Sequence, residues 1–539
     1  MKRMLAIALA ALLVFGLTAC GGTIEKADTP VASVATGAAG ETAQTKQVVV
    51  GVSMGTTTMD PAHEYEWDAE MMLHSVYPTL VTSDYADESK ILPCVASEWV
   101  ISDDGLTYTF TLNQGIKFTT GKELKASDVA FSLNRLKGAA GNPSFLLSSV
   151  ESVEATGDYE VTVTLSEPNP ALLNILTRAS AGVYDAEAAQ ANGATCDSSD
   201  AGQAYFDTTS IGCGPYKISS FNSGSELVLV KNPDSYFPAG NVDTYIIRNI
   251  ADSATQQMEL EGGDLDFALD LTADQTALLE GNENIKLVSF DTMDIFFLGL
   301  NASEEYGKEL ANPTVREAIR YAIDYPGLCA LAGNGATTPA GIIPKGFLGY
   351  AGETTITRDV EKAKALLTEA GYPDGITFSM GVIPDMAPDG VSFMTLAQKA
   401  QADLAEAGIT VNIEPQEVAV YLEGYRDGKQ QSVMCHWGPD YNDSNNQLAF
   451  LPGNTVGLRL GWTAEMDPEL AELGQKASVE TDSDKRAELF TEIQKQMDEK
   501  NAPAVVLLQP GKTWAVSSRL KNLTVSAAFC FDFVSLDVQ

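Results

Sequence analysis

ITFSMGVIPDMAPDGVSFMTLAQKAQADLAEAGITVNI, residues 376–413, is the stretch that decides the fold. Residues 376–380 and 409–413 have the apolar and β-branched composition of strands. Residues 393–407 between them predict a helix, which Gly408 ends. A strand, a helix and a second strand in this order imply a parallel, doubly wound lobe with helices on both faces of its sheet. Ligands of such sheets bind at the carboxyl ends of the strands.

A second stretch, CHWGPDYNDSNN at residues 435–446, follows a predicted strand of the same lobe. It places the indole of Trp437 shortly before the carboxylate of Asp440. Gly438 and Pro439 between them break regular structure and let the backbone approach a ligand closely. An aromatic face beside a fixed carboxylate suits a small ligand that carries an amino group. The alternative is an ordinary turn, in which the indole packs and Asp440 bonds the turn backbone.

The composition describes a large and strongly acidic chain. Its 539 residues are enough for roughly three lobes. With 34 Lys and Arg residues against 73 Asp and Glu residues, the formal net charge is −39. This charge argues against nucleic-acid binding, which needs a basic face that neutralises phosphates, and against adsorption to anionic lipid. It does not identify the ligand, because surface acidity mostly serves solubility.

Residues 1–20 are typical of an export signal. Two basic residues precede an apolar run that would be about 23 Å long as a helix, too short to span a bilayer. LTAC at residues 17–20, followed by two glycines, resembles the bacterial lipoprotein cleavage site, which implies that Cys20 becomes the lipid-bearing N-terminus. The alternative is an ordinary cleaved signal with a chance cysteine. Residues 21–46 are rich in Ala, Thr and Gly and predict a flexible linker.

The other six cysteines show neither a C-x-x-C pair nor the spacing of zinc ligands. Cys213 and Cys530 stand in apolar, strand-like contexts that predict buried thiols. A disulfide between Cys94 and Cys196 could form in an oxidising compartment, but the sequence does not assign it.

Periodic patterns predict further strands and helices along the chain. One helix begins at Ser127, whose hydroxyl would cap it, and another spans residues 312–324 with Asn312 as its cap. We expect Arg316 and Arg320, which point away from the apolar face of the second helix, to lie at the surface or to pair between lobes. The predicted strands include 47–52, 106–112, 159–165, 211–218, 226–231, 296–300, 504–508 and 526–534.

The first predicted strand runs into a polar loop, SMGTTT at residues 53–58. Its hydroxyl groups and backbone would lie near whatever the protein binds. An equally good interpretation is a Ser- and Thr-rich turn at the end of a strand.

Motifs spread along the chain resemble one family. They are ASEW at 96–99, SDDGLTYTFTLNQGIKF at 102–118, ASDVAFSL at 126–133, GCGPYK at 212–217, KNPD at 231–234, VREAI at 315–319, YAID at 321–324 and AKALLTEAGYP at 363–373. Together they look like the signature of solute-binding protein family 5, the peptide, dipeptide and nickel binding components of ABC importers. The resemblance covers essentially residues 47–539, and the combination is specific although each motif alone is weak. The chain departs from the pattern at Cys213, Thr119 and Thr120, which are not assigned to the ligand.

The resemblance implies a bilobal α/β fold of the periplasmic-binding-protein type, with a two-segment hinge near residues 300 and 507. Such a protein captures a peptide between two closing lobes and delivers it to a membrane permease and, through it, to an ATPase. It would be a monomer outside the cytoplasm, either periplasmic or anchored to the cell membrane through a lipid on Cys20. The implied limits are 47–78, 198–300 and 508–539 for lobe I, 79–197 for an inserted α+β lobe, and 301–507 for lobe II.

The resemblance also implies a ligand site. In peptide-binding members a Trp-x-x-Asp-Tyr segment supplies the carboxylate that holds the ligand's α-amino group, and WGPDY at residues 437–441 matches it. The loop at residues 54–58 matches the region that lies along the ligand backbone. The partner of the ligand's carboxylate is not identified, and Arg426 and Arg459 are guesses. The predicted ligand-binding residues are Asp440, Trp437, Tyr441, Gly438, Met54, Gly55, Thr56 and Thr57.

Two other classes of protein compete with this interpretation. An enzyme is disfavoured, because the chain has no Gly-x-Ser-x-Gly elbow, no Gly-rich phosphate loop and no His-Glu-x-x-His, and its three histidines make a general base scarce. A binder of nickel or another metal chelate is the better alternative, since His436 beside Cys435 could gather with His63 and His74. The Trp-x-x-Asp match favours an amine ligand, and we expect neither a resident metal nor another cofactor.

Overall fold

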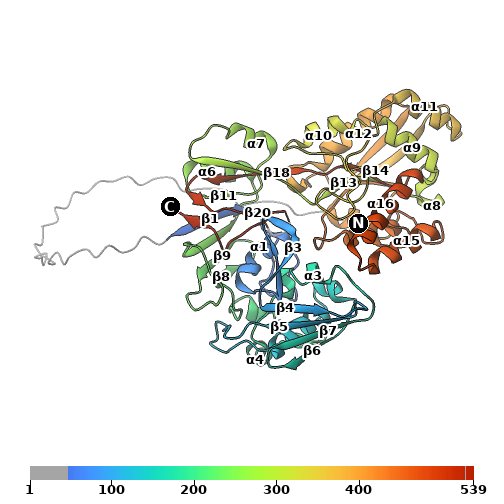
Figure 1. The fold of residues 1–539 in the computed structure, drawn as a ribbon. Helices are drawn as coiled ribbons and strands as arrows, with labels where there is room; N and C mark the ends of the chain where they lie inside the picture. Colours follow the sequence, from blue (N-terminus) through green and yellow to red (C-terminus); the bar gives the residue numbers. More distant parts are fainter. Residues whose placement is uncertain (1–45, 528–529) are drawn as a thin grey trace, which may run out of the picture. The chain divides into compact units, whose positions relative to one another are not determined.

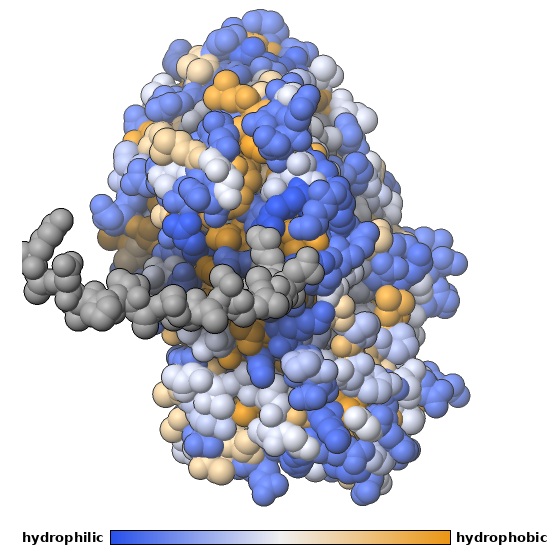
Figure 2. All heavy atoms as spheres, turned by 90° about the vertical axis from the view of Figure 1, so that its left-hand side faces the viewer, coloured by the Kyte–Doolittle hydropathy of each residue, from blue (hydrophilic) through white to orange (hydrophobic). Residues whose placement is uncertain are grey.

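The computed structural model describes residues 46–527 and 530–539 (Figure 1). The predicted signal segment with Cys20, and all of the predicted linker except Lys46, lie outside the described residues. Within the described residues, no helix combines the length and the apolar character that crossing a bilayer demands. The face shown in Figure 2 is mostly hydrophilic, which fits the acidic composition of the chain.

A seven-stranded sheet takes its strands from three separate parts of the chain, in the order β12-β18-β11-β1-β10-β9-β8. Its central strand β1 pairs in parallel with β10 and β11. The C-terminal strand β18, which the sequence analysis did not predict, lies between β11 and β12 and is antiparallel to both. The strands are β1 Gln47–Val52, β8 Tyr216–Asn222, β9 Glu226–Lys231, β10 Thr244–Asn249, β11 Phe267–Ala268, β12 Ile285–Asp291 and β18 Gly511–Ser517.

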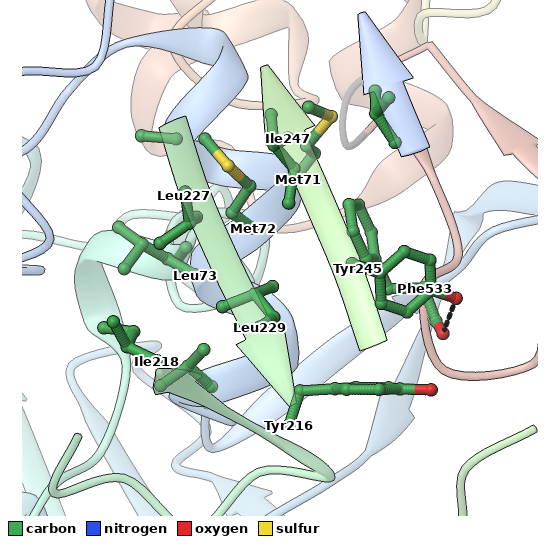
Figure 3. Packing of buried hydrophobic residues seen from close by; sticks show 14 of the residues in the cluster. Met71, Met72, Leu73, Tyr216, Ile218, Leu227, Leu229, Tyr245, Ile247 and Phe533 are labelled. Carbon is green, nitrogen blue, oxygen red and sulfur yellow. Dashed lines mark hydrogen bonds between the residues drawn. The ribbon is translucent and has the colours of Figure 1, made fainter. Parts of the chain in front are cut away.

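Helix α1, Trp67–Val76, packs its buried side chains on this sheet. Figure 3 shows Met71 and Met72 of the helix against Leu227 and other residues of β9 and β10. The hydroxyl of Tyr245 donates to the carbonyl oxygen of Phe533 at 2.9 Å, which ties the C-terminal segment to the same core.

A five-stranded sheet has the order β15-β14-β16-β13-β17. As predicted, β14 and β15 are parallel, and β16 continues this direction. The expectation of a wholly parallel sheet is wrong, because β13 is antiparallel to both β16 and β17. The physical reason is that β13 leads the chain from the seven-stranded sheet into this one, whereas β17 leads it back to the seven-stranded sheet. The strands are β13 Ile295–Leu300, β14 Ile376–Val382, β15 Ile409–Pro415, β16 Ser432–Trp437 and β17 Ala504–Leu508.

Helices cover both faces of the five-stranded sheet, as expected (Figure 1). Phe296 and Leu298 of the fully buried strand β13 belong to a core with α9 to α12, whereas Ile295 and Phe297 belong to a second core with α13 to α16. The helices of the first core are α9 Pro313–Ala322, α10 Tyr325–Ala332, α11 Val360–Glu369 and α12 Phe393–Glu406. Those of the second are α13 Val418–Arg426, α14 Thr455–Arg459, α15 Pro468–Val479 and α16 Ser483–Glu499.

A third, four-stranded antiparallel sheet has the order β4-β5-β7-β6 and its own core. Helix α2, Ala126–Gly138, packs on it. The predicted cap at Ser127 is wrong, because the helix begins one residue earlier and Lys125 is the N-cap. The carboxylate of Asp128 reaches back and accepts the backbone N–H of Lys125 at 3.0 Å. The strands are β4 Ala96–Ile101, β5 Thr107–Leu112, β6 Val150–Gly157 and β7 Glu160–Leu165.

Short elements complete the described chain. They are β2 Val81–Asp84, β3 Asp87–Pro93, β19 Leu520–Lys521, β20 Val525–Ser526, β21 Cys530–Phe531, β22 Asp537–Val538, α3 Leu172–Ile175, α4 Ala186–Ala191, α5 Gln203–Phe206, α6 Ser253–Gly262, α7 Ala273–Leu278, α8 Glu304–Gly307 and the 3-10 turns η1 Asn142–Leu147, η2 Ala179–Ala181, η3 Lys308–Ala311, η4 Pro388–Gly390 and η5 Ser444–Phe450. In the described part of the predicted strand 526–534, the strand residues are Ser526 and Cys530–Phe531. The strand predicted from residue 211 begins at Tyr216.

The chain crosses between the seven- and five-stranded sheets twice, once between β12 and β13 and once between β17 and β18. The two crossings are bonded to each other, since the amide of Gln509 donates to the carbonyl of Thr292 at 2.6 Å and the Thr292 hydroxyl donates to the carbonyl of Pro510 at 2.8 Å. The first crossing precedes Ile295, so β13 lies in the five-stranded sheet although the predicted limit left residues up to 300 in lobe I. The other limits of the predicted lobes stay a prediction.

One further expectation about a single side chain is corrected, and one question that the sequence left open is answered. Arg316 is buried instead of exposed, and its guanidinium donates to the carbonyls of Asn501, Leu310 and Ala311. Cys94 and Cys196 are free thiols, so this structure holds no disulfide between them. Cys213 is buried as predicted, and the side chain of Cys530 lies outside the described part.

A buried ion network joins α2 to the segment after β1. The guanidinium of Arg135 is fully buried and pairs with Asp60 at 2.6 Å and with Asp200 at 2.8 Å. His63 lies 2.9 Å from Asp200. Although burial raises the pKa of Asp200, hydrogen bonds from Arg135 and His63 hold that pKa at about 2. Asp200 is therefore ionised at neutral pH and depends on its partners.

We expect Arg135→Met to lower the free energy of unfolding by about 3–5 kcal/mol, because it leaves two buried carboxylates without their cation. Arg248→Met is the matched control, since Arg248 pairs with Glu259 where both side chains are partly exposed, and should cost less than about 1 kcal/mol. Urea unfolding followed by circular dichroism measures both. Equal losses in the two variants would contradict a structural role for the buried network.

Candidate functional site

The carboxylate of Asp440 accepts one hydrogen bond on each oxygen. The hydroxyl of Tyr65 donates to one oxygen, and the amide of Asn446 donates to the other at 2.9 Å. The carbonyl oxygen of the same amide accepts the indole N–H of Trp437 at 2.9 Å. Asn446 is buried and so fixes the indole and the carboxylate relative to each other. Both donors are neutral, so the negative charge of Asp440 has no cation beside it in these contacts.

Tyr65 brings the segment before α1 to the segment after β16. Its ring lies edge-on against Phe145, with the ring centres 5.7 Å apart. Burial raises the pKa of Tyr65 well above its ordinary value, and the charge of Asp440 raises it further. Tyr65 therefore stays protonated and acts as a hydrogen-bond donor to Asp440.

A cavity of about 590 Å³ lies beside Asp440. This volume falls within the range of about 300–1,000 Å³ that is typical of small-molecule sites. Three of the predicted ligand residues line it, namely Trp437, Asp440 and Tyr441. Gly438 and the predicted residues Met54, Gly55, Thr56 and Thr57 are not among its lining residues. Whether those five residues contact a ligand stays a prediction.

Gly438 makes room for another carboxyl group. A Cβ atom at this position would lie 2.9 Å from a carboxyl oxygen of Asp294, closer than ordinary packing allows. Burial raises the pKa of Asp294 well above its ordinary value, and neighbouring Asp389 raises it further. Position 438 therefore requires a glycine because Asp294, at the crossing between β12 and β13, lies close to its backbone.

The turn that carries Tyr441 is bonded on several sides. Tyr441 packs against the core of the four-stranded sheet, and burial raises its pKa. Asp443 accepts from the guanidinium of Arg486 at 2.9 Å, and the amide of Asn442 donates to Glu88 at 2.9 Å. These bonds hold the segment after Asp440 in place.

The loop after β1 has its backbone N–H groups occupied by side chains. Asp68 accepts the N–H groups of Gly55 and Thr56, and Glu64 accepts those of Thr57 and Thr58. Ser53, Met54 and Met59 donate in the same way, to Asp270, Asn249 and Asp207. If residues 54–57 lie along a ligand, they can offer it carbonyl oxygens and side chains, and not these N–H groups.

The three histidines do not gather around one point. His63 pairs with Asp200, His74 lies 3.0 Å from Glu70, and His436 packs against the rings of Phe296 and Phe393. Burial lowers the pKa of His436, so it stays neutral at physiological pH.

In the described residues, the side chains that could hold a metal ion form a group that includes neither His436 nor His74. There the side chains Asp60, His63 and Asp200 have the spacing that could hold a metal ion. Arg135 already pairs with both carboxylates of that group and supplies its positive charge. The metal-chelate alternative would gather His436 with His63 and His74, and the described residues do not form that cluster.

Neither guessed partner for a ligand carboxylate lines the cavity. Arg459 lies over the ring of Tyr425, 5.2 Å from its centre. Arg426 is exposed at the end of α13.

Three residues that border the candidate site were not among the predicted ligand residues. Tyr65 is remote from Asp440 in sequence, and no local pattern marks it. Glu167 lines the cavity but stands in an ordinary turn after β7. Asn446 ends the polar stretch at residues 435–446, so the sequence shows that it can form hydrogen bonds. It does not show that the partners are Trp437 and Asp440.

Comparisons with known proteins place the chain among transport proteins. Residues 90–457 match the family described as bacterial extracellular solute-binding proteins, family 5. The chain is 30% identical over 373 residues to the glutathione-binding protein GsiB of Escherichia coli, covering 68% of this chain and 69% of that protein. It is similar in structure to HbpA2 from Haemophilus parasuis, with a TM-score of 0.79, 25% identity and coverage of 92% of this chain and 100% of the other. DppA from Helicobacter pylori, solved in complex with the peptide STSA, gives a TM-score of 0.74 and 26% identity, with 91% and 98% covered.

We expect Asp68→Ala to lower the free energy of unfolding by about 2–5 kcal/mol, because two backbone N–H groups and the Thr56 hydroxyl lose their buried acceptor. Asp68→Asn is the matched variant, since its amide oxygen can still accept these bonds, and it should lose less than half as much. Thermal and urea unfolding measure both variants. If the two lose the same stability, the hydrogen bonds of this loop are not what Asp68 contributes.

Proposed function

Because the chain belongs to family 5 of the bacterial extracellular solute-binding proteins, we propose that it captures peptides for an ABC importer. A protein of this family is the solute-binding component of the transporter and not an enzyme. The peptide would be enclosed as two lobes close, and the closed form would be read by the permease, whose ATPase drives transport. Two relatives support a peptide-like ligand, since GsiB is named for glutathione and DppA was solved with STSA.

The observation that carries the proposal is the carboxylate of Asp440 at the wall of the cavity beside Trp437. Its two bonds come from Tyr65 and Asn446, which leaves acceptor capacity on both oxygens. An ammonium group that leaves water must meet an anion, and a hydrogen bond between charged groups contributes about 1.5–3 kcal/mol. Asp440 would hold the α-amino group of the peptide, with the indole against its first residue.

We also propose that the mature protein is tethered to the membrane by a lipid on Cys20. The lipoprotein-like sequence at residues 17–20 supports this. Two or more acyl chains would make the anchoring stable.

We expect Asp440→Ala to weaken peptide binding at least about 30-fold, because a cost of about 2–5 kcal/mol follows when a buried charge loses its partner. Thermal shift against short peptides, glutathione and nickel chelates selects the ligand, and calorimetry then measures the affinity. Asp374→Ala is the control, since Asp374 is an exposed aspartate outside the cavity lining. An unchanged affinity in Asp440→Ala would remove this residue from the site, and stabilisation by the chelates alone would favour the metal-chelate alternative.

We expect Cys20→Ala to release the protein from the membrane fraction when the full chain is expressed in a bacterial host. Fractionation followed by immunoblotting measures this, and metabolic labelling with a fatty-acid analogue should mark the wild type alone. Labelling that persists in Cys20→Ala would contradict the proposed anchor.

A further inference from the structure

The wall of the cavity beside Asp440 is acidic. Its charged lining residues are Asp440 and Glu167, and its described lining contains neither Lys, Arg nor His. The polar lining residues are otherwise neutral, namely Ser148, Ser149, Asn169, Tyr441, Asn445, Asn446, Asn454, Thr455, Gln475 and Ser478. A ligand anion in this cavity would therefore find no counter-ion on its wall, whereas a ligand cation would find two.

Glu167 is not used by the fold. It stands in the turn after β7, its side chain is exposed, and it forms neither a hydrogen bond nor an ion pair with the rest of the described chain. This differs from Asp440, which is committed to Tyr65 and Asn446. A carboxylate that borders a cavity and is not bonded to the described protein can bind a ligand.

The backbone next to Glu167 is held firmly. The amide of Asn169 donates to the hydroxyl of Ser149 at 3.0 Å, and its carbonyl oxygen accepts the backbone N–H of Ala171 at 3.0 Å. The main-chain carbonyl of Asn169 also accepts the hydroxyl of Tyr108 at 3.3 Å. Pro168 lies between Glu167 and Asn169. Its ring fixes its own φ angle and restricts the backbone of Glu167 before it. The turn therefore presents Glu167 from a fixed position, which limits the entropy lost when a ligand binds.

We propose that this cavity selects peptides with a second cation near the amino terminus, a Lys or Arg side chain in the first or second residue, with Glu167 as its counter-ion. The inference rests on the proposed function, in which Asp440 holds the α-amino group. The ligand then carries two positive charges into a cavity with two carboxylates. Apolar lining residues such as Phe145, Leu146 and Leu458 suit the aliphatic stem of a Lys or Arg side chain.

The same wall disfavours acidic peptides. A Glu side chain placed in the cavity would lie among two like charges and would lose its hydration without gaining a cation. Glutathione carries two carboxylates and one amino group, so this chain should bind it less well than a dibasic peptide, although GsiB, to which the chain is similar, is named for it.

The test compares three peptides that differ at one side chain: Lys-Ala-Ala, norleucine-Ala-Ala and Glu-Ala-Ala, with the same series carrying the change in the second residue. Norleucine has the stem of Lys without its ammonium group, so the ratio of the two affinities isolates the charge. Calorimetry with the wild-type protein should give a Lys over norleucine preference of about threefold or more, which falls as salt is raised. The Glu peptide should bind most weakly.

Glu167→Gln should bring the Lys over norleucine ratio close to one, because only the Lys peptide loses a counter-ion. Glu154→Gln is the matched control, because Glu154 is an exposed residue of the same sheet outside the cavity lining, and it changes the net charge equally. Circular dichroism checks that both variants fold. A ratio that survives in Glu167→Gln, or a Glu peptide that binds as well as the Lys peptide, overturns the inference while peptide binding itself stands. Absence of binding by every peptide overturns the proposed function and this inference together.

Discussion

A single carboxylate, that of Asp440, is the point on which the candidate site depends. Its oxygens accept hydrogen bonds from the neutral donors Tyr65 and Asn446, and Asn446 also fixes the indole of Trp437. Neutral donors hold a carboxylate in position without cancelling its charge, so the site keeps its attraction for a cation. An Arg at this place would have produced a closed structural ion pair, as Arg135 does with Asp60 and Asp200.

The same acidic chain uses its carboxylates in two ways. Asp68 and Glu64 satisfy the backbone N–H groups of the loop after β1, and burial raises the pKa of Asp68. These groups serve the fold and fix a loop that has no regular secondary structure. Glu167 instead has no such partner in the described chain and borders the cavity. The formal charge of −39 does not show which carboxylates stabilise the fold and which border the cavity. The neighbours of each carboxylate decide this.

The architecture gives the site its setting. The two crossings between the seven- and five-stranded sheets are bonded through Gln509 and Thr292, so they form a narrow connection between two separate cores. Tyr65 and Asp440 belong to different sides of this connection and still share a hydrogen bond. A contact of this kind can be made or lost as domains move about a short hinge. In the proposed function it would link the carboxylate of Asp440 to the closing of the lobes.

The sequence by itself determined the elements with strong periodicity and clear ends. The strand-helix-strand unit at 376–413 formed as predicted, and Asn312 caps α9 by accepting the N–H of Thr314. The family motifs were also legible, because each is a local run of residues. The stretch at 435–446 was recognisable as a candidate site for the same reason.

Only the tertiary structure decided which groups meet. Tyr65 and Asp440 are 375 residues apart in sequence, and Glu167 reaches the same cavity from a third part of the chain. The direction of β13, the burial of Arg316 and the cap of α2 depend on neighbours that no local pattern encodes. A side chain's role as structural anchor or ligand contact is set by the charge and hydrogen-bonding groups around it, and folding brings those together from distant positions.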